Sequence, residues 1–414
     1  MDSSLVHSSI ESGYWGIMVV TYPYISGLVA GSFIVASLSH VFHKKEFNAL
    51  GPLAVLVSLS FLIAAPLTVL GDARQPSNAY ELVTRDHFPY SPLSTFILIW
   101  FAYIVLMLVE LYVLFRRTNV FLAAKPNKRA KIHKILALGS KDTSEASKRR
   151  DHRVLFWLSS IGILLAFLFH GYIGFVFGAT KARALWATPL MPILFIVSAI
   201  VSGIAAMILI YILVMKFVNF KVDKLLAKNL LSYLMLFLLL DLFLDIVDIL
   251  TSGIPEYTQG STYSAFYNLM LHGPFTFSYF GVQLGLGTVV PIVLWLIPKV
   301  RNSVIGSLVI SLFVLVGVYA MRWNVVLGGQ ADSKISSNSV ITNSIPLFGY
   351  DSIQSVLGVF AVALLLFLLF AWLFPWAQES DFEREPTKKQ KAFENVITET
   401  EATRKSTLVE EGGI

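Results

Sequence analysis

Ionisable side chains lie inside stretches of this sequence that are otherwise apolar, and they are the first candidates for chemistry. Asp241, Asp245 and Asp248 share one such stretch at spacings of four and three residues, which puts all three carboxylates on one face of a helix. A carboxylate stripe is costly against lipid and favours a proton path or a polar lining. Hydrogen bonds to neighbouring helices are the alternative interpretation. Glu110, in another apolar stretch, is a fourth candidate for the path.

A second group of polar residues lies at the ends of apolar stretches from distant parts of the chain. If these stretches cross a membrane alternately, the group reaches one depth near the outer face. A ring carrier with two carbonyls needs apolar walls, a donor for each oxygen and a group that takes protons as electrons leave. Singly, each residue is equally compatible with an anchor at headgroup level. The candidates are Tyr22, Tyr24, Asp72, Arg74, His170 and Tyr172, with Arg322 and Gln330 completing a polar cluster at the outer face.

Haem is a competing ligand, because two imidazoles at similar depth can bind its iron, and His170 and His272 form one possible pair. No second pair is evident. The chain has no cysteine, which excludes disulfides, thiolate-held iron–sulfur clusters and thiol nucleophiles. A phosphate-binding glycine loop, a zinc motif and a nucleophile elbow are also missing from the sequence. We therefore expect no haem, cluster or metal bound by this chain, and no catalytic residue of its own.

The elements that carry these residues must be membrane helices. Of 414 residues, 56% are hydrophobic and 14% are charged, with a mean hydropathy of +0.69. Soluble domains average about 45–50% and about 25%. A helix needs about 20 apolar residues to cross the hydrocarbon core. Runs of that kind predict nine spans, at residues 15–39, 49–70, 91–115, 154–177, 186–215, 230–250, 274–298, 304–321 and 353–376.

Basic residues predict the orientation of these spans, since cytoplasmic segments are enriched in Lys and Arg. With the N-terminus outside, 26 of the 32 Lys and Arg residues fall on the inner side and six on the outer side. The net charge of +6 is thus a topology signal that also attracts anionic lipid, and it does not indicate nucleic-acid binding. We expect a multi-pass protein of the cytoplasmic membrane with its C-terminus in the cytoplasm.

The predicted fold class is an all-α integral membrane protein of about nine transmembrane helices, arranged as two four-helix bundles plus an extra C-terminal helix. Small-residue faces that allow close helix contact support the duplication: Gly27, Ala30 and Gly31 lie in the first span, and Ser202 and Gly203 in the fifth. The expected parts are an outer segment (1–14), the first bundle (15–178) with a basic inner loop (116–153), the second bundle (186–325), an outer loop (326–352), the last helix (353–376) and a cytoplasmic tail (377–414).

Several short motifs, in this order, resemble one known family. The first span carries YISGLVAGS at 24–32, and the second ends in GDARQP at 71–76, followed by Ser91-Pro92. The fourth span carries GYIGF at 171–175, and RWNVVLGGQ follows at 322–330. From about residue 14 to 376 the chain resembles the NrfD/polysulfide-reductase membrane subunits.

This resemblance implies a quinone- or menaquinone-reactive membrane subunit of a respiratory oxidoreductase complex. It implies an iron–sulfur (ferredoxin-like) subunit and a molybdopterin-type catalytic subunit on the outer face, and a quinone site near that face. By position, Tyr172 matches the family's fourth-helix tyrosine, and Asp72 with Arg74 matches the polar end of the second helix. The alternative function is a secondary transporter that uses the Asp241–Asp245–Asp248 stripe for ion coupling.

Overall fold

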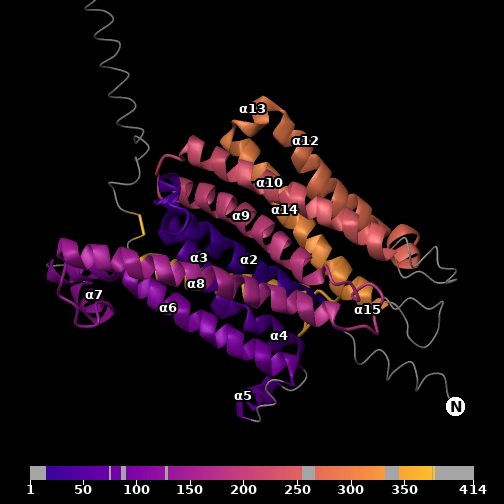
Figure 1. Ribbon diagram of the computed structural model, residues 1–414, viewed down its shortest axis with the longest axis horizontal. Helices are drawn as coiled ribbons and strands as arrows, with labels where there is room; N and C mark the ends of the chain where they lie inside the picture. Colours follow the sequence, from indigo (N-terminus) through magenta and orange to yellow (C-terminus); the bar gives the residue numbers. More distant parts are fainter. Residues whose placement is uncertain are drawn as a thin grey trace, which may run out of the picture.

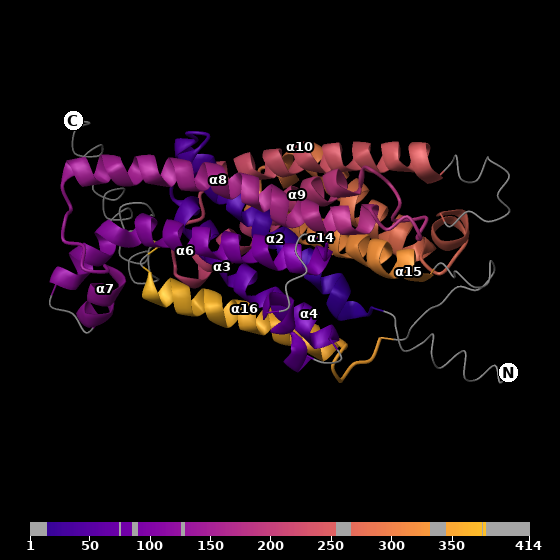
Figure 2. The same ribbon diagram turned by 60° about the horizontal axis from the view of Figure 1, so that its bottom comes forward.

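The computed structural model describes residues 15–73, 76–84, 90–125, 129–253, 266–331, 345–374 and 376–377. These residues form helices and short connections without any strand, and the helices lie side by side along the long axis of the molecule (Figures 1 and 2). Nine helices in the described part are long and apolar enough to cross a membrane. The predicted all-helical class and the number of spans are therefore confirmed, whereas the grouping into two four-helix bundles stays a prediction.

The long elements of the first half are α2 (Ile17–His40), α3 (Leu50–Ala64), which continues as α4 (Pro66–Asp72), α6 (Pro92–Ala124) and α8 (Glu145–Gly178). Those of the second half are α9 (Met191–Phe217), α10 (Lys224–Asp248), η5 (Phe277–Val289), which continues as α12 (Val290–Leu296), and α14 (Val304–Trp323), before the last helix, α16 (Ile353–Leu373). The shorter elements are η1 (Lys45–Phe47), η2 (Pro76–Asn78), α5 (Glu81–Thr84), α7 (Ala130–Leu136), η3 (Ile249–Gly253), η4 (Phe266–Leu271), α13 (Pro298–Arg301), η6 (Asn324–Gly328) and α15 (Gly329–Ala331).

Helices α2 and α9 form the centre of the molecule and pack directly against each other. Most of their residues are buried, whereas α16 and η5 with α12 are mainly exposed to the surroundings that a bilayer provides. The contact requires glycine, because a Cβ atom on Gly31 would overlap the backbone at Ala199 and Gly203, and one on Gly203 would overlap Gly31. The two small-residue faces noted in the sequence thus pack on each other.

The inner ends of α6 and α8 extend far beyond the predicted spans. With 33 and 34 residues, each is about 50 Å long, whereas the hydrocarbon core is about 30 Å thick. Arg116, which is buried, joins them: its Nε donates to Asp151 at 3.1 Å, and its Nη1 donates to Ser140 at 2.7 Å. The inner loop expected at 116–153 is therefore mostly helix, because a buried ion pair continues the α6–α8 contact outside the lipid.

The turn between α7 and α8 is held by its own hydrogen bonds. Asp142 accepts a bond from the backbone N–H of Ser144, and this bond keeps the pKa of the Asp142 carboxyl below its ordinary value. The hydroxyl of Ser144 in turn accepts from Ser147 N and caps α8. The basic inner segment is consequently an ordered extension of the helices.

Helix α16 returns across the molecule to pack against α3, α4 and α2 of the first half (Figure 2). Just before it, Asp351 accepts a hydrogen bond from the backbone N–H of Met18 at 2.8 Å, in the first turn of α2. A carboxylate at this place satisfies a free N–H and complements the helix dipole. The last helix therefore fixes the outer end of the central helix.

The α2–α9 contact yields a prediction with an internal control. We expect Gly203→Leu to destabilise the purified protein by about 1–3 kcal/mol or more, because the side chain has no space against Gly31. Gly358→Leu on α16 should be neutral, since no atom lies within 4 Å of its Cβ position. Thermal unfolding in detergent or lipid measures both variants. Equal transition temperatures would contradict the tight helix crossing.

Candidate functional site

Arg322, in the last turn of α14, is completely buried and lies at the centre of a polar cluster. Its Nη2 donates to the hydroxyl of Ser198 at 2.6 Å and lies 3.1 Å from Nε2 of His170. The guanidinium also stacks over the ring of Phe195, 4.1 Å from its centre. His170 and Phe195 lie on α8 and α9, so three helices converge on one charge. Sequence reasoning assigned Arg322 to the outer-face cluster and missed these buried partners.

His170 is itself fully buried, and protein groups contact both of its ring nitrogens. Nδ1 lies 3.3 Å from the hydroxyl of Ser26 on α2, and Nε2 faces Arg322. Because α2 also contributes Tyr24, which interacts electrostatically with Arg322, four helices share this cluster. The candidate haem partner His272 is exposed and packs on Tyr267, 4.5 Å between ring centres.

The tyrosines at the start of α2 divide between two environments. Tyr24 packs edge-on against Tyr319 of α14, whose hydroxyl lies 3.1 Å from that of Thr21. Tyr22 faces the first half instead, where its ring meets Phe96 of α6 edge-on at 5.6 Å. The Tyr22 hydroxyl is buried and has no hydrogen-bond partner among the described residues.

Phe96 connects Tyr22 to the predicted fourth-helix tyrosine. The ring of Tyr172 on α8 stacks against Phe96 with 6.4 Å between centres and an interplanar angle of 28°. Phe96 also stacks on Phe169, at 5.1 Å. These residues form an aromatic wall, defined as Tyr22, Phe96, Phe169 and Tyr172, at the outer ends of α2, α6 and α8. A flat ring ligand can stack on such a wall.

The remaining candidates occupy three separate places. Asp72 is the last residue of α4 and is partly exposed, while Arg74 lies outside the described residues. Glu110 is buried between α6 and α8, where Ser159 donates a hydrogen bond to it at 2.7 Å. Gln330 of α15 accepts a bond from the backbone N–H of Trp15, and its own backbone carbonyl accepts from Arg183. Gln330 thus ties the outer connections together.

The three aspartates lie along α10 as predicted, but their surroundings differ. Asp241 is buried, and one of its carboxylate oxygens has no hydrogen-bond partner among the described residues. Asp245 accepts a bond from Gln283 of η5 at 3.3 Å, and Asp248 accepts one from Thr188 at 2.6 Å. Asp241 and Asp245 both interact electrostatically with Arg322. Arg322 therefore joins the stripe to the His170 cluster.

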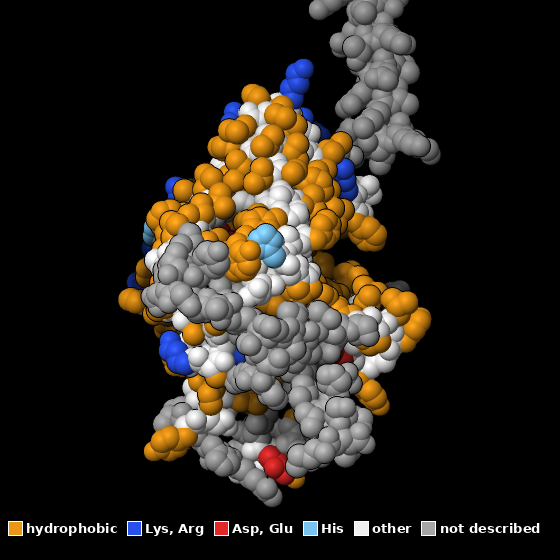
Figure 3. All heavy atoms as spheres, turned by 90° about the vertical axis from the view of Figure 1, so that its right-hand side faces the viewer, with side chains coloured by type: hydrophobic (Ala, Val, Ile, Leu, Met, Phe, Trp, Pro, Cys, Tyr) orange, Lys and Arg blue, Asp and Glu red, His pale blue; other side chains and the backbone are white. Residues whose placement is uncertain are grey.

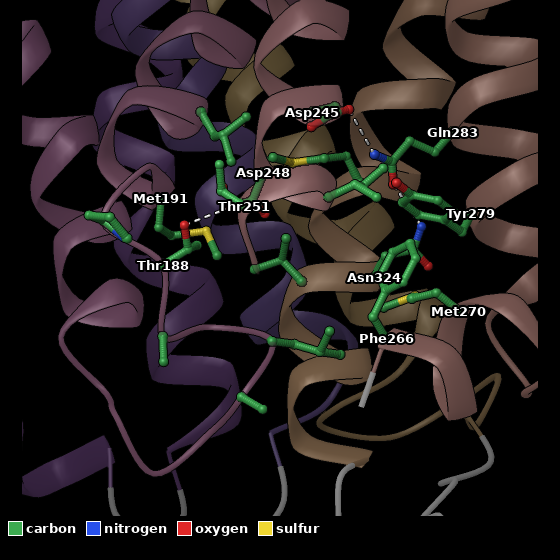
Figure 4. A pocket seen from close by; sticks show the side chains of 18 residues that line it. Thr188, Met191, Asp245, Asp248, Thr251, Phe266, Met270, Tyr279, Gln283 and Asn324 are labelled. Atoms are coloured by element: carbon green, nitrogen blue, oxygen red, sulfur yellow. Dashed lines mark hydrogen bonds between the residues drawn. The ribbon is translucent and has the colours of Figure 1, made fainter. Parts of the chain in front are cut away.

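A cavity of about 510 Å³ opens beside Asp245 and Asp248 (Figure 4). Its size lies in the range of ligand pockets. One wall is polar, and the other is formed by apolar side chains such as Met191, Leu194 and Met270. The polar residues that line it are Thr188, Asp245, Asp248, Thr251, Tyr279, Gln283 and Asn324.

Hydrogen bonds extend the polar wall of the cavity away from the aspartates. Gln283 accepts a bond from Asn324 at 2.8 Å, and Asn324 accepts one from Ser278 at 2.5 Å. The segments that carry these residues, η5 and η6, are π-helical, as are η3 and η4 around the same cavity. The π-helix is rare and is frequent at functional sites. Gln283 and Asn324 escaped sequence analysis, although polar side chains in apolar helices were a usable signal.

The described residues contain no group of three or more His, Asp or Glu side chains that could hold a metal ion. Fold and site together define a multi-pass integral membrane protein with a buried, ionisable polar core. The family model of NrfD, polysulphide reductase, matches residues 6–332, and the chain belongs to this family.

Three relatives with assigned names are reductase or oxidoreductase subunits. The chain is 31% identical over 379 residues to the C-type selenate reductase subunit of Mesobacillus selenatarsenatis, covering 87% of this chain and 85% of the relative. It is 31% identical to a putative dimethyl sulfoxide reductase membrane subunit of Halobacterium salinarum, over 47% of this chain and 43% of the relative. It is 25% identical to an Hdr-like menaquinol oxidoreductase integral membrane subunit of Archaeoglobus fulgidus, over 45% and 38%. The chain is accordingly a membrane subunit of the oxidoreductase class.

The polar wall of the cavity can be tested through stability. We expect Gln283→Leu to cost about 1–3 kcal/mol, because it leaves Asn324 and Asp245 without their buried hydrogen-bond partner. Thr251→Val lines the same cavity but bonds only its own helix, so its cost should stay within about 0.5 kcal/mol. Thermal unfolding of the purified chain measures the difference. A Gln283 variant as stable as the Thr251 variant would contradict the bonded wall.

Proposed function

We propose that this chain is the quinone-reactive membrane subunit of a respiratory oxidoreductase complex. It exchanges electrons between a quinone or menaquinone pool and an iron–sulfur subunit docked on the outer face. Family membership supports this function over the secondary transporter. The observation that carries the quinone assignment is the buried, unpartnered hydroxyl of Tyr22 beside the aromatic wall. An unpaired phenol donor next to stacked rings suits a flat ligand with carbonyl oxygens.

The ring lies at the outer ends of the first four spans. Tyr22 and Tyr172 hold the carbonyl on the side of the aromatic wall, and His170 with Tyr24 marks the inner limit of the site. Asp72, steadied by Arg74, exchanges protons with the outer side. Oxidation of one quinol releases two electrons and two protons, so the electrons pass to the partner's cluster and the protons pass to carboxylates and water.

A proton route through Asp248, Asp245 and Asp241 extends inward from the cavity. The supporting observations are the cavity beside the first two carboxylates and the buried position of the third. Glu110, bonded to Ser159 between α6 and α8, serves an inner section of such a route. Proton movement along it would conserve energy from electron transfer.

The partners are an iron–sulfur (ferredoxin-like) subunit and a molybdopterin-type catalytic subunit on the outer face. The catalytic subunit selects the terminal substrate, as the selenate and dimethyl sulfoxide reductase names of the relatives suggest. The cluster ligands must come from the partner, because this chain has no cysteine. On the end of the molecule that faces the viewer in Figure 3, charged side chains among the described residues are few and scattered between apolar ones. This surface suits a protein partner more than a highly charged ligand.

The orientation is testable separately. We propose the cytoplasmic membrane, with the N-terminus outside and the C-terminus in the cytoplasm, because basic residues concentrate on the C-terminal side. A reporter active only in the cytoplasm should be active when fused after residue 377 and inactive when inserted at residues 79–80. The reverse pattern would invert the topology and move the quinone site to the inner face.

The quinone site is tested in the assembled complex. We expect Tyr172→Phe and Asp72→Asn each to lower quinol oxidation about 10- to 100-fold, through loss of a ring contact and of a proton acceptor respectively. Tyr233→Phe, a partly buried tyrosine of α10 outside the site, is the matched control and should keep the wild-type rate. Unchanged quinol oxidation in both site variants, with the complex intact, would refute the site.

A further inference from the structure

Arg322 carries a buried charge that no ion pair neutralises among the described residues. Its hydrogen bonds run to neutral groups, Ser198 and the backbone carbonyl of Phe195, and its contact with His170 is to an imidazole. The Nε atom of Arg322 is buried and has no hydrogen-bond partner in the described part of the chain. A charge in this position requires a counter-charge nearby.

Asp241 supplies the complementary deficiency on the neighbouring helix. Its Oδ1 is buried and has no hydrogen-bond partner within the described ranges, and its carboxylate interacts electrostatically with Arg322. Helices α10 and α14 contact each other, and both pack on α9. A free guanidinium N–H and a free carboxylate oxygen thus lie in adjacent helices, within electrostatic range but without an ion pair.

We infer that the Arg322 guanidinium is a positioning charge with two alternative partners, the His170–Ser198 pair toward the first half and the Asp241 carboxylate toward the second. The described structure has the first arrangement. Movement of the guanidinium toward Asp241 would pair both free atoms and would release His170. Arginine suits this role, because its five N–H donors can keep one bond while another changes.

This assignment rests on the proposed function for its consequence, since it links the two sites that the function uses. A change of charge at the quinone beside His170 alters the preferred partner of Arg322, and that in turn alters the electrostatic environment of Asp241. No atom or electron is transferred to Arg322 itself. The guanidinium acts only through His170 and Asp241.

The primary test is a double-mutant cycle on thermal unfolding of the assembled complex, which needs no quinone. Arg322→Gln and Asp241→Asn should each lower the transition temperature, and the double variant should lose clearly less than the sum of the two losses, because each single variant leaves one buried charge uncompensated. Arg301→Gln, a cation of α13 away from the cluster, is the control and should be additive with Asp241→Asn. Additive losses for Arg322 and Asp241 would overturn the inference.

A second measurement tests the alternative partners. Reduction of bound quinone should change the infrared carboxyl band that disappears in Asp241→Asn, and Arg322→Gln should abolish this redox response while Ser311→Ala, a buried serine of α14, keeps it. A redox response that persists in Arg322→Gln would overturn the link. If the wild-type complex oxidises no quinol, the proposed function fails, whereas the unfolding cycle still decides whether Arg322 and Asp241 are coupled.

Discussion

Burial of the Arg322 guanidinium among apolar helices is the constraint on which the rest of this structure depends. A cation in a lipid-embedded core is tolerated only where polar groups surround it. The groups that do so here come from α8 and α9, with Tyr24 of α2 in electrostatic range. These helices can meet only because Gly31 and Gly203 let α2 and α9 approach to backbone contact. Small residues in the centre and a charge near the outer end are thus parts of one packing solution.

The same constraint accounts for the asymmetry between the two halves. In the first half, aromatic rings fill the space beside the cluster, as the stacking of Phe96 on Phe169 and Tyr172 illustrates. In the second half the corresponding space is a cavity, and the helices around it contain π-helical segments. An extra residue in a helical turn rotates the following side chains, which brings Gln283 and Asn324 into one hydrogen-bonded chain with Asp245.

Much of the fold follows from the sequence alone, because lipid imposes a simple rule of length and hydropathy. All nine spans were predicted, and the spacing of Asp241, Asp245 and Asp248 placed them on one helix. The extension of α6 and α8 was missed, since the Arg116–Asp151 pair replaces lipid contact with a polar one that hydropathy cannot register. The buried partners of Arg322 were missed for a related reason. Serine hydroxyls such as Ser198 are common in membrane helices, and only tertiary packing selects which of them faces a charge.

The distribution of acidic groups completes the argument about charge. Among the described ionisable residues within the spans, Arg322 meets Asp241 and Asp245 electrostatically, whereas Glu110 is bonded to Ser159 in another interface. One carboxylate is enough to balance one guanidinium, so the second aspartate near Arg322 is in excess of what neutrality requires. An excess carboxyl beside a cavity costs less when it can bind and release a proton than when it must stay charged. Retention of both aspartates is therefore better explained by proton exchange than by structural neutralisation of Arg322 alone.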